Sequence, residues 1–280
     1  IEKAMAKVYR TYENVHIGFA DEGLNVLTGA PVERFNVAEP GVLDFLRREL
    51  DRKSVVCVSG SSTLSDVLMT EQSVLGLSGG RAYTVLDIFK DVPTDGGKPV
   101  TLIKLKSPEG KHLEWNGDWS FSSPKWSSQL RARFGYTQNP QDGSFFLDDE
   151  TLRNFFSQAT TCYINPSYVN SNIRVFAGRT HSHMLEFVCK KEGTYYLSLY
   201  QDSKRKFSQS HNYEKSKARM FVASVHEGRL EALHSKAVDN GDLHQEFVLK
   251  AGTYVMSCKV KWKFFDKYHF VVTSYGPDTI

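Results

Sequence analysis

The sequence lacks the features that define several large classes of protein. Its 280 residues contain no unbroken apolar run of about 18 residues, so it predicts no membrane-spanning helix. The net charge is only +3, which gives no chain-wide attraction to nucleic acid, and no nucleic-acid partner is expected. The first residues, IEKAMAKVYRTYENV, form a charged amphipathic run rather than a signal peptide. They begin with Ile rather than Met, so we expect the chain to be a fragment of a longer protein.

Cysteine is scarce, and its spacing argues against a metal site. Cys57, Cys162, Cys189 and Cys258 form no CxxC pair, so no zinc site of the usual spacing is predicted. Cys57 and Cys258 lie inside apolar, strand-like runs. We therefore interpret the cysteines as buried reduced thiols of an intracellular, cytoplasmic protein.

Common catalytic motifs are also missing. The sequence has no G-x-S-x-G string, no H-E-x-x-H string and no glycine-rich phosphate loop, so spacing alone identifies no catalytic set and no cofactor. What remains is an ordinary globular composition, with 40% hydrophobic and 24% charged residues. The length is sufficient for about two domains.

The first part of the chain mixes helices and strands. Apolar spacing predicts helices over residues 1–15 and 41–51, and a buried strand over 54–60. The turn-rich string PTDGGKP separates two further strand candidates, RAYTVLDIFKDV and VTLIKLKSP, as in a hairpin. A helix is expected over 147–159, with Asp148 or Asp149 as its cap. This pattern is typical of an α+β subdomain.

In the second part of the chain, the sequence pattern predicts strands only. After INPSY, short apolar runs such as NIRVFAG, HMLEFVCK and GTYYLSLYQD follow one another, separated by turn residues. No segment with helical periodicity is evident there. The pattern predicts an antiparallel β-sandwich, and we place the domain boundary at residues 169/170.

Several strings resemble those of one protein family. GGRAYTVLDIFK, LIKLKSPEG, LEWNGDWSFSSPKW and DGSFFLDDETLRNFF occur in the order found in calpains. The most specific piece is the tryptophan-rich run from Glu114 to Trp126. Residues 1–169 resemble the second half of the calpain protease core, which has a papain-like fold. Residues 170–280, with the strings NPSY and FVLKAGTYVMSC, more weakly resemble the β-sandwich that follows it.

This resemblance implies that the chain does not cut peptides. Calpain chemistry uses a cysteine nucleophile, a histidine base and an asparagine that orients the imidazole. The cysteine string of the family is absent, Arg81 stands at the histidine position and Ser107 stands at the asparagine position. A guanidinium carries only N–H donors, so it cannot act as a general base. Glu109 replaces the tryptophan that follows the asparagine in the family.

A calcium site of the family is also incomplete. The resemblance places Glu114 and Asp142 at two acidic positions, whereas Phe121 and Ser144 occupy the other two. Calcium takes about six to eight oxygen ligands, and its affinity depends on their charge. We therefore expect Glu114 and Asp142 to be remnants that bind no calcium.

Two basic segments lie in the second part of the chain. The run KRKFSQSHNYEKSKAR begins with Lys204, Arg205 and Lys206. In CKVKWKF, the side chains of Cys258, Val260, Trp262 and Phe264 alternate with Lys259, Lys261 and Lys263, which predicts an apolar face and a basic face. Each basic segment has two interpretations: a solvated surface, including lysines that protect a sheet edge, or a surface that binds an acidic partner.

The resemblance therefore implies a non-catalytic structural or interaction module. Calpain-like proteins of this kind associate with the cytoskeleton, the flagellum or membranes, so we expect cytoskeletal or axonemal protein partners or an anionic membrane surface. Two alternatives remain open. One is a calcium-dependent cysteine endopeptidase whose nucleophile lies outside this chain. The other is a lipid-binding module that acts through the sandwich.

Overall fold

The computed structural model describes most of the chain, namely residues 1–16, 18–60, 75–77, 80–94, 97–110, 115–136, 142–179, 181–207 and 211–280. It divides into two compact units. One consists of Ile1–Phe19, Val26–Pro31 and Asn165–Ile280, and the other of Ala20–Asn25 and Val32–Ile164. No helix in the described part of the chain is long and apolar enough to cross a membrane.

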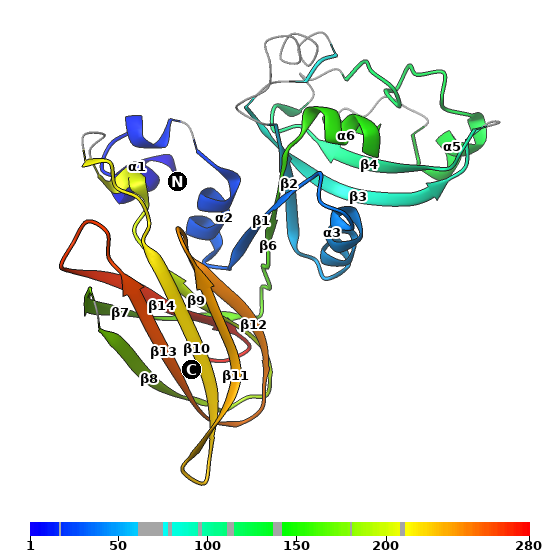
Figure 1. Ribbon diagram of the computed structural model, residues 1–280. Coiled ribbons are helices and arrows are strands. Elements are labelled where there is room, and N and C mark those ends of the chain that lie inside the picture. Colours follow the sequence, from blue (N-terminus) through cyan, green and yellow to red (C-terminus); the bar gives the residue numbers. More distant parts are fainter. Residues whose placement is uncertain are drawn as a thin grey trace. The chain divides into compact units, whose positions relative to one another are not determined.

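The elements are short, and strands dominate (Figure 1). The helices are α1 (Glu2–Val8), η1 (Glu13–Val15), α2 (Ala20–Thr28), α3 (Val42–Asp51), α5 (Ser128–Arg133), α6 (Asp149–Phe155) and η3 (Lys204–Lys206). The strands are β1 (Val32–Asn36), β2 (Val55–Ser59), β3 (Ala82–Val92), β4 (Val100–Lys106), β5 (Ser144–Asp148), β6 (Gln158–Cys162), β7 (Val169–Gly178), β8 (Ser182–Cys189), β9 (Gly193–Tyr200), β10 (Lys217–His226), β11 (Arg229–Val238), β12 (Leu243–Leu249), β13 (Gly252–Lys261) and β14 (Lys267–Gly276).

One unit is built on a six-stranded antiparallel sheet with the order β1-β6-β2-β3-β4-β5. Helix α3 lies against β2 and β3 (Figure 1). It starts after Gly41, whose φ of 77° is accessible to glycine without a steric penalty. The predicted helix over 41–51 is thus confirmed, and it buries Val42, Leu43 and Leu46 against the sheet.

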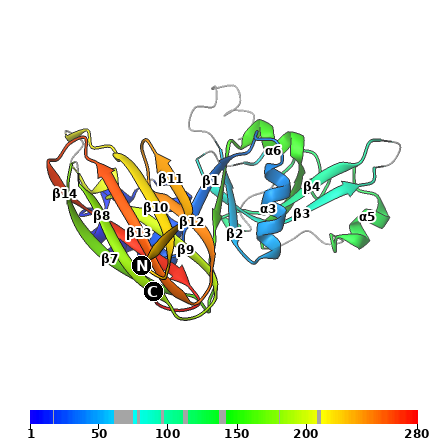
Figure 2. The same ribbon diagram turned by 60° about the horizontal axis from the view of Figure 1, so that its bottom comes forward.

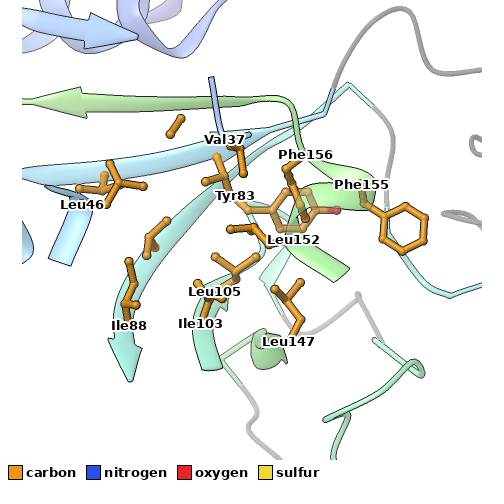
Figure 3. Close-up of a cluster of buried hydrophobic side chains, with 14 of the residues drawn as sticks. Val37, Leu46, Tyr83, Ile88, Ile103, Leu105, Leu147, Leu152, Phe155 and Phe156 are labelled. Carbon is orange, nitrogen blue, oxygen red and sulfur yellow. The ribbon is translucent and has the colours of Figure 1, made fainter. Parts of the chain in front are cut away.

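The core of this unit gathers side chains from the sheet, α3 and α6 (Figure 3). Tyr83 of β3 contacts Phe156 edge-to-face, with 5.4 Å between the ring centroids. A smaller aromatic cluster around Trp119 and Trp126 packs with Leu130 of α5 near the far end of the β3–β4 hairpin (Figure 2). The sheet is therefore fixed at both ends of that hairpin.

The helix predicted over 147–159 is shorter in the structure. Residues 144–148 are buried without alternation and form β5, and the helix begins only at Asp149. Asp148 is its N-cap, because its Oδ1 accepts a hydrogen bond of 2.9 Å from the N–H of Thr151. Phe156 has an extended backbone and ends the helix, so the chain can enter β6.

The predicted antiparallel β-sandwich is confirmed. Its two four-stranded sheets have the orders β11-β10-β13-β8 and β12-β9-β14-β7. Cys258, Val260 and Trp262 point into the core, as the alternation predicts. Phe264 does not: it is 40% exposed, because β13 ends at Lys261 and the alternation ends with it.

The N-terminal segment packs in the same unit as the sandwich. The helix predicted over 1–15 breaks at Arg10, which has a φ of 78°, so α1 ends at Val8 and η1 follows separately. Asn14 Nδ2 donates to the carbonyl of Arg205 at 3.0 Å, and Arg205 Nη1 donates to the carbonyl of Asn14 at 2.8 Å. The unit that holds the sandwich therefore includes N-terminal residues that the sequence assigns to the protease core. The last boundary between the two units along the chain lies between Ile164 and Asn165.

Candidate functional site

The β3–β4 hairpin brings together two of the predicted site residues. Arg81 directly precedes β3, and Ser107 directly follows β4. The antiparallel register pairs Thr84 with Lys106, so the start of one strand lies beside the end of the other. Arg81 and Ser107 therefore occupy the same end of the hairpin.

At this end of the hairpin, Arg81 forms an ion pair with Glu109. Arg81 Nε lies 3.3 Å from Glu109 Oε1, and the two side chains are 59% and 36% exposed. The guanidinium offers only donors, and its partner is a carboxylate. The pair can bind and orient charged groups, but Arg81 cannot remove a proton from a nucleophile.

Ser107 is part of a tight turn. The side chain is buried, and its Oγ accepts a hydrogen bond of 3.1 Å from the N–H of Glu109. Its own N–H donates to the carbonyl of Gly143, and its carbonyl accepts from the N–H of Gly110. These bonds make Ser107 a structural residue that also positions the backbone of Glu109.

The cysteines provide no evident substitute for a nucleophile. All four are free thiols, and Cys162, Cys189 and Cys258 are buried. Cys57 lies on β2 beside Thr84, but burial raises the pKa of its thiol to about 11, although a hydrogen bond with Thr84 acts in the opposite direction. Since the thiolate is the nucleophile, a thiol with this pKa is almost unreactive at neutral pH.

The predicted calcium remnant is only partly described. Glu114 lies outside the described residues. Asp142 Oδ1 accepts a hydrogen bond of 3.0 Å from the N–H of Ser144, and Lys106 Nζ lies 3.7 Å from its other oxygen. Hydrogen bonding from the side chain and backbone of Ser144 holds the pKa of Asp142 below its usual value, with a smaller contribution from Lys106.

The other two calcium positions serve the packing of the unit. The Phe121 ring lies 5.0 Å from the guanidinium carbon of Arg131 and contacts Tyr136 edge-to-face, whereas Ser144 is buried in β5. Within the described ranges, no group of three or more His, Cys, Asp or Glu side chains is placed to hold a metal.

An open cavity of about 690 Å³ lies elsewhere in this unit. Trp115, Asp118 and Ser120 line it on one side, and Thr151 and Asn154 of α6 line it on the other. Arg81, Ser107 and Asp142 are not among its lining residues. The cavity is therefore separate from the site that the sequence indicates.

The six basic residues predicted to bind a partner fall into two groups. Three are engaged within the chain. Arg205 bonds to Asn14, Lys206 Nζ contacts Asp202 at 2.6 Å, and Lys263 Nζ contacts Glu214 at 3.3 Å and Asn240 at 2.6 Å. The other three, Lys204, Lys259 and Lys261, are exposed, and their side chains make no ion pair with the described residues.

Asp202 is the centre of a polar cluster that the sequence does not reveal. Its carboxylate is 11% exposed, accepts a hydrogen bond of 2.8 Å from the Tyr268 hydroxyl and lies 3.4 Å from His269 Nε2. Burial acts to raise the pKa of Asp202, but the hydrogen bonds from Lys206 and Tyr268 outweigh it, so the net shift is downward. Because Tyr268 and His269 lie more than sixty positions from Asp202, no local pattern signals their part in the cluster.

Comparison with known proteins points to one family. The model of the family described as "Calpain family cysteine protease" matches residues 1–163. Rat calpain-9 is 33% identical over 177 residues, which are 61% of this chain and 25% of that protein. Calpain-A of Drosophila melanogaster is 32% identical over 175 residues, 59% of this chain and 20% of that protein. The maize calpain-type cysteine protease DEK1 is 27% identical over 174 residues, 59% of this chain and 8% of its own.

The matched region is thus a quarter or less of the length of each of these relatives. Among solved structures, tripeptidyl peptidase 2 covers 75% of this chain and 21% of its own length, at 10% identity and a TM-score of 0.28. A similarity of that degree carries no argument about fold or function.

Proposed function

Because this chain belongs to the calpain family of cysteine proteases, we propose that it is a non-catalytic member that acts as a structural or interaction module. The observation that supports the proposal most directly is the Arg81–Glu109 ion pair. The resemblance puts Arg81 at the position of the family's histidine base. A guanidinium has no lone pair with which to accept a proton from a thiol, as that histidine does, and the carboxylate of Glu109 is engaged with the guanidinium.

Two other residues near this end of the hairpin support the same conclusion. The Oγ of Ser107 accepts a hydrogen bond from the backbone N–H of Glu109, and burial raises the pKa of the Cys57 thiol to about 11. Loss of a catalytic nucleophile or base alone typically lowers kcat by several orders of magnitude, on the order of 10⁴–10⁶ in a serine protease. The alternative, an endopeptidase completed by residues outside this chain, would still require a different base.

A peptidase assay on the full-length protein tests this proposal. Casein cleavage is measured with and without calcium, and we expect no calcium-dependent cleavage above that of a buffer control. The contradicting result is cleavage that co-purifies with the protein and disappears when Arg81 or Glu109 is changed to Ala. Such a result would show that this end of the hairpin takes part in catalysis.

The proposed setting is intracellular, with cytoskeletal or axonemal protein partners or an anionic membrane surface. A binding role is supported by three exposed lysines that make no ion pair with the described residues, namely Lys204, Lys259 and Lys261. Co-sedimentation of the full-length protein with purified microtubules tests the cytoskeletal partner. Pelleting with anionic liposomes, with and without calcium, tests the membrane. Failure of both would leave the chain without the proposed attachment, whatever the peptidase assay shows.

A further inference from the structure

Two central strands of the sandwich place four cations directly opposite one another. The register of β10 and β13 pairs Lys217 with Lys261, and Arg219 with Lys259. All four side chains are exposed, whereas the residues between them along each strand are buried in the core. The four therefore share the outer face of the sheet and form two adjacent cationic rows. We call this set the cationic square.

Most of this charge is uncompensated. Lys217 Nζ contacts Asp239 at 2.7 Å, but that carboxylate is 82% exposed. Arg219, Lys259 and Lys261 make no ion pair with the described residues. The cross-strand neighbours that complete the Arg219–Lys259 row are Ala237 and Ser182, which carry no charge. Like charges directly opposite one another in a sheet are destabilising, so the square lowers the stability of the sandwich.

Protection of a sheet edge does not explain this arrangement. Lysines on an exposed edge strand prevent edge-to-edge aggregation. In this sheet the order is β11-β10-β13-β8, so β10 and β13 are interior strands, and Arg219 and Lys259 each have a paired neighbour on both sides (Figure 1). Edge protection therefore does not account for the Arg219–Lys259 row. A solvated surface and a binding surface remain, and the repulsion within the square favours the binding surface.

The positively charged part of this sheet face covers only the two rows of the square. Along the same face, the next row pairs Phe221 with Ser257, and Val255 beyond it lies opposite Glu186. An anionic membrane would present charge over the whole face of the sheet, including Glu186. A partner with a few closely spaced carboxylates matches the two cationic rows better.

We propose that the cationic square binds an extended acidic peptide of a partner protein. Residues two apart on one strand face are roughly 6.6–6.8 Å apart, and so are alternate side chains of an extended peptide. A peptide with acidic residues at alternate positions therefore places one carboxylate on each row. Arg219 supplies a planar fork of donors that suits a carboxylate, and the three lysines add point charges.

This inference rests on the proposed role as an interaction module and names its surface and its partner class. The two fail separately. A peptidase assay decides whether the chain is non-catalytic, whereas the binding experiment below decides only whether this face binds acidic peptides. Peptide binding together with peptidase activity would contradict only the proposed function. No binding and no peptidase activity would contradict only the present inference.

The test is a fluorescence-anisotropy titration of the whole protein into a labelled peptide of alternating glutamate and serine, at low salt. The variant Arg219→Gln/Lys259→Gln removes the central row. The matched control, Lys190→Gln/Lys250→Gln, removes the same charge from exposed positions beside the opposite end of the same sheet. We expect the central-row variant to weaken binding about tenfold or more and the control to change it less than about twofold.

A second readout shows whether the variants fold. Removing one like-charged pair relieves repulsion, so the Tm of Arg219→Gln/Lys259→Gln should equal or exceed that of the wild type. The variant Lys217→Gln/Lys261→Gln gives an independent test of the other row. For comparison, the same titrations use a peptide with its glutamates in one block, and vesicles of phosphatidylcholine and phosphatidylserine.

Three outcomes would overturn the proposal. One is equal binding of the alternating peptide by the wild type and both row variants. Another is a preference for the block peptide, which would remove the argument from spacing. The third is square-dependent binding to the vesicles but not to the peptide, which would assign the surface to a membrane.

Discussion

Arg81 and Glu109 pair with each other at 3.3 Å, at two positions where the resemblance to calpains implies a histidine and a tryptophan. Each change alone would leave an unmatched charge near the end of the β3–β4 hairpin. Together they neutralise one another, and the N–H of Glu109 is held by the buried Ser107. Both residues are thus part of the local structure at this end of the hairpin.

This pair should be weakly stabilising. Both side chains are about a third or more exposed, so solvent screens their attraction. A double-mutant cycle with Arg81→Ala and Glu109→Ala, followed by urea unfolding, should give a coupling free energy of about 0.2–1 kcal/mol. The coupling should shrink in high salt. A coupling free energy of zero at low salt would show that the two side chains do not interact in solution.

Changing Arg81 to His should not create a reactive cysteine. The cysteine nearest to Arg81 in the sheet is Cys57, which lies opposite Thr84 of β3. Burial raises the pKa of its thiol to about 11. We expect iodoacetamide at neutral pH to label neither the native wild type nor the native Arg81→His variant at an appreciable rate. The urea-unfolded chain, in which all four thiols are accessible, is the positive control. Rapid labelling of native Cys57 would argue that a nucleophile is present after all.

Calcium should bind weakly or not at all to the remnant acidic positions. Asp142 is engaged by Ser144 and Lys106, and Phe121, at a position where the resemblance implies a carboxylate, packs against Arg131. Calorimetric titration of the whole protein should show no micromolar binding that Glu114→Ala or Asp142→Ala removes. Micromolar affinity that either substitution abolishes would restore a functional calcium site.

Two neighbouring aromatic residues should differ sharply in their contribution to stability. Trp262 is 2% exposed, and its Nε1 donates to the carbonyl of Ala177 at 2.9 Å, whereas Phe264 is 40% exposed. Trp262→Ala should lower the free energy of unfolding by about 3–5 kcal/mol. Phe264→Ala should lower it by less than about 1 kcal/mol, since a surface position loses little. Similar losses in both variants would mean that β13 continues its alternation beyond Lys261.

The stability of the sandwich should depend on pH through His269. Burial is the largest cause that lowers the pKa of His269 below 6.5; Arg174 and Lys206 also lower it, and Asp202 opposes them. The folded protein therefore prefers the neutral imidazole. Its contribution to stability is fully present above the unfolded pKa of about 6.5 and is lost as the pH falls through the lower folded value. Thermal unfolding at a series of pH values below 7 should show a falling Tm, and His269→Gln should flatten that part of the curve.

Asp202 should produce a separate loss at lower pH. Its pKa is lowered in the folded protein, so its contribution is present above the unfolded value of about 3.9 and is lost as the pH falls through the folded value. Asp202→Asn should remove this acid-dependent step. An unchanged Tm of the wild type between pH 7 and the acid limit would contradict both predictions.

Local sequence patterns predict those elements whose formation depends mainly on residues near one another in the chain. Helix α3 follows from its apolar spacing and the glycine before it, and β13 from the alternation of Cys258, Val260 and Trp262. Strand β11 gave no such pattern, because most of its residues are exposed. The short strands β1 and β6 were also missed, since they pair with residues far apart in sequence. Helix α2 was missed too, and none of its residues is buried.

The candidate site could also be predicted only in part. The resemblance located Arg81 and Ser107, and the register of the hairpin brings them to one end. Their ion-pairing and hydrogen-bonding partners could not be read from spacing. The basic residues show the limit most clearly: Arg205 bonds to Asn14 across 191 positions, and Lys217 opposes Lys261 only through the register of the sheet.

The packing of the N-terminal segment has a consequence for the order in which the units can be completed. Residues near both ends of this chain, such as Glu2 and Asp278, belong to one compact unit, and the six-stranded unit is inserted between its parts. Contacts between distant parts of the chain hold the N-terminal segment in this unit. Asn14 and Arg205 exchange two hydrogen bonds, and Asn170 Nδ2 donates to the carbonyl of Gly29 at 2.7 Å. The compact unit that holds the sandwich is therefore discontinuous in sequence, and it cannot be complete until the chain has passed through the six-stranded unit.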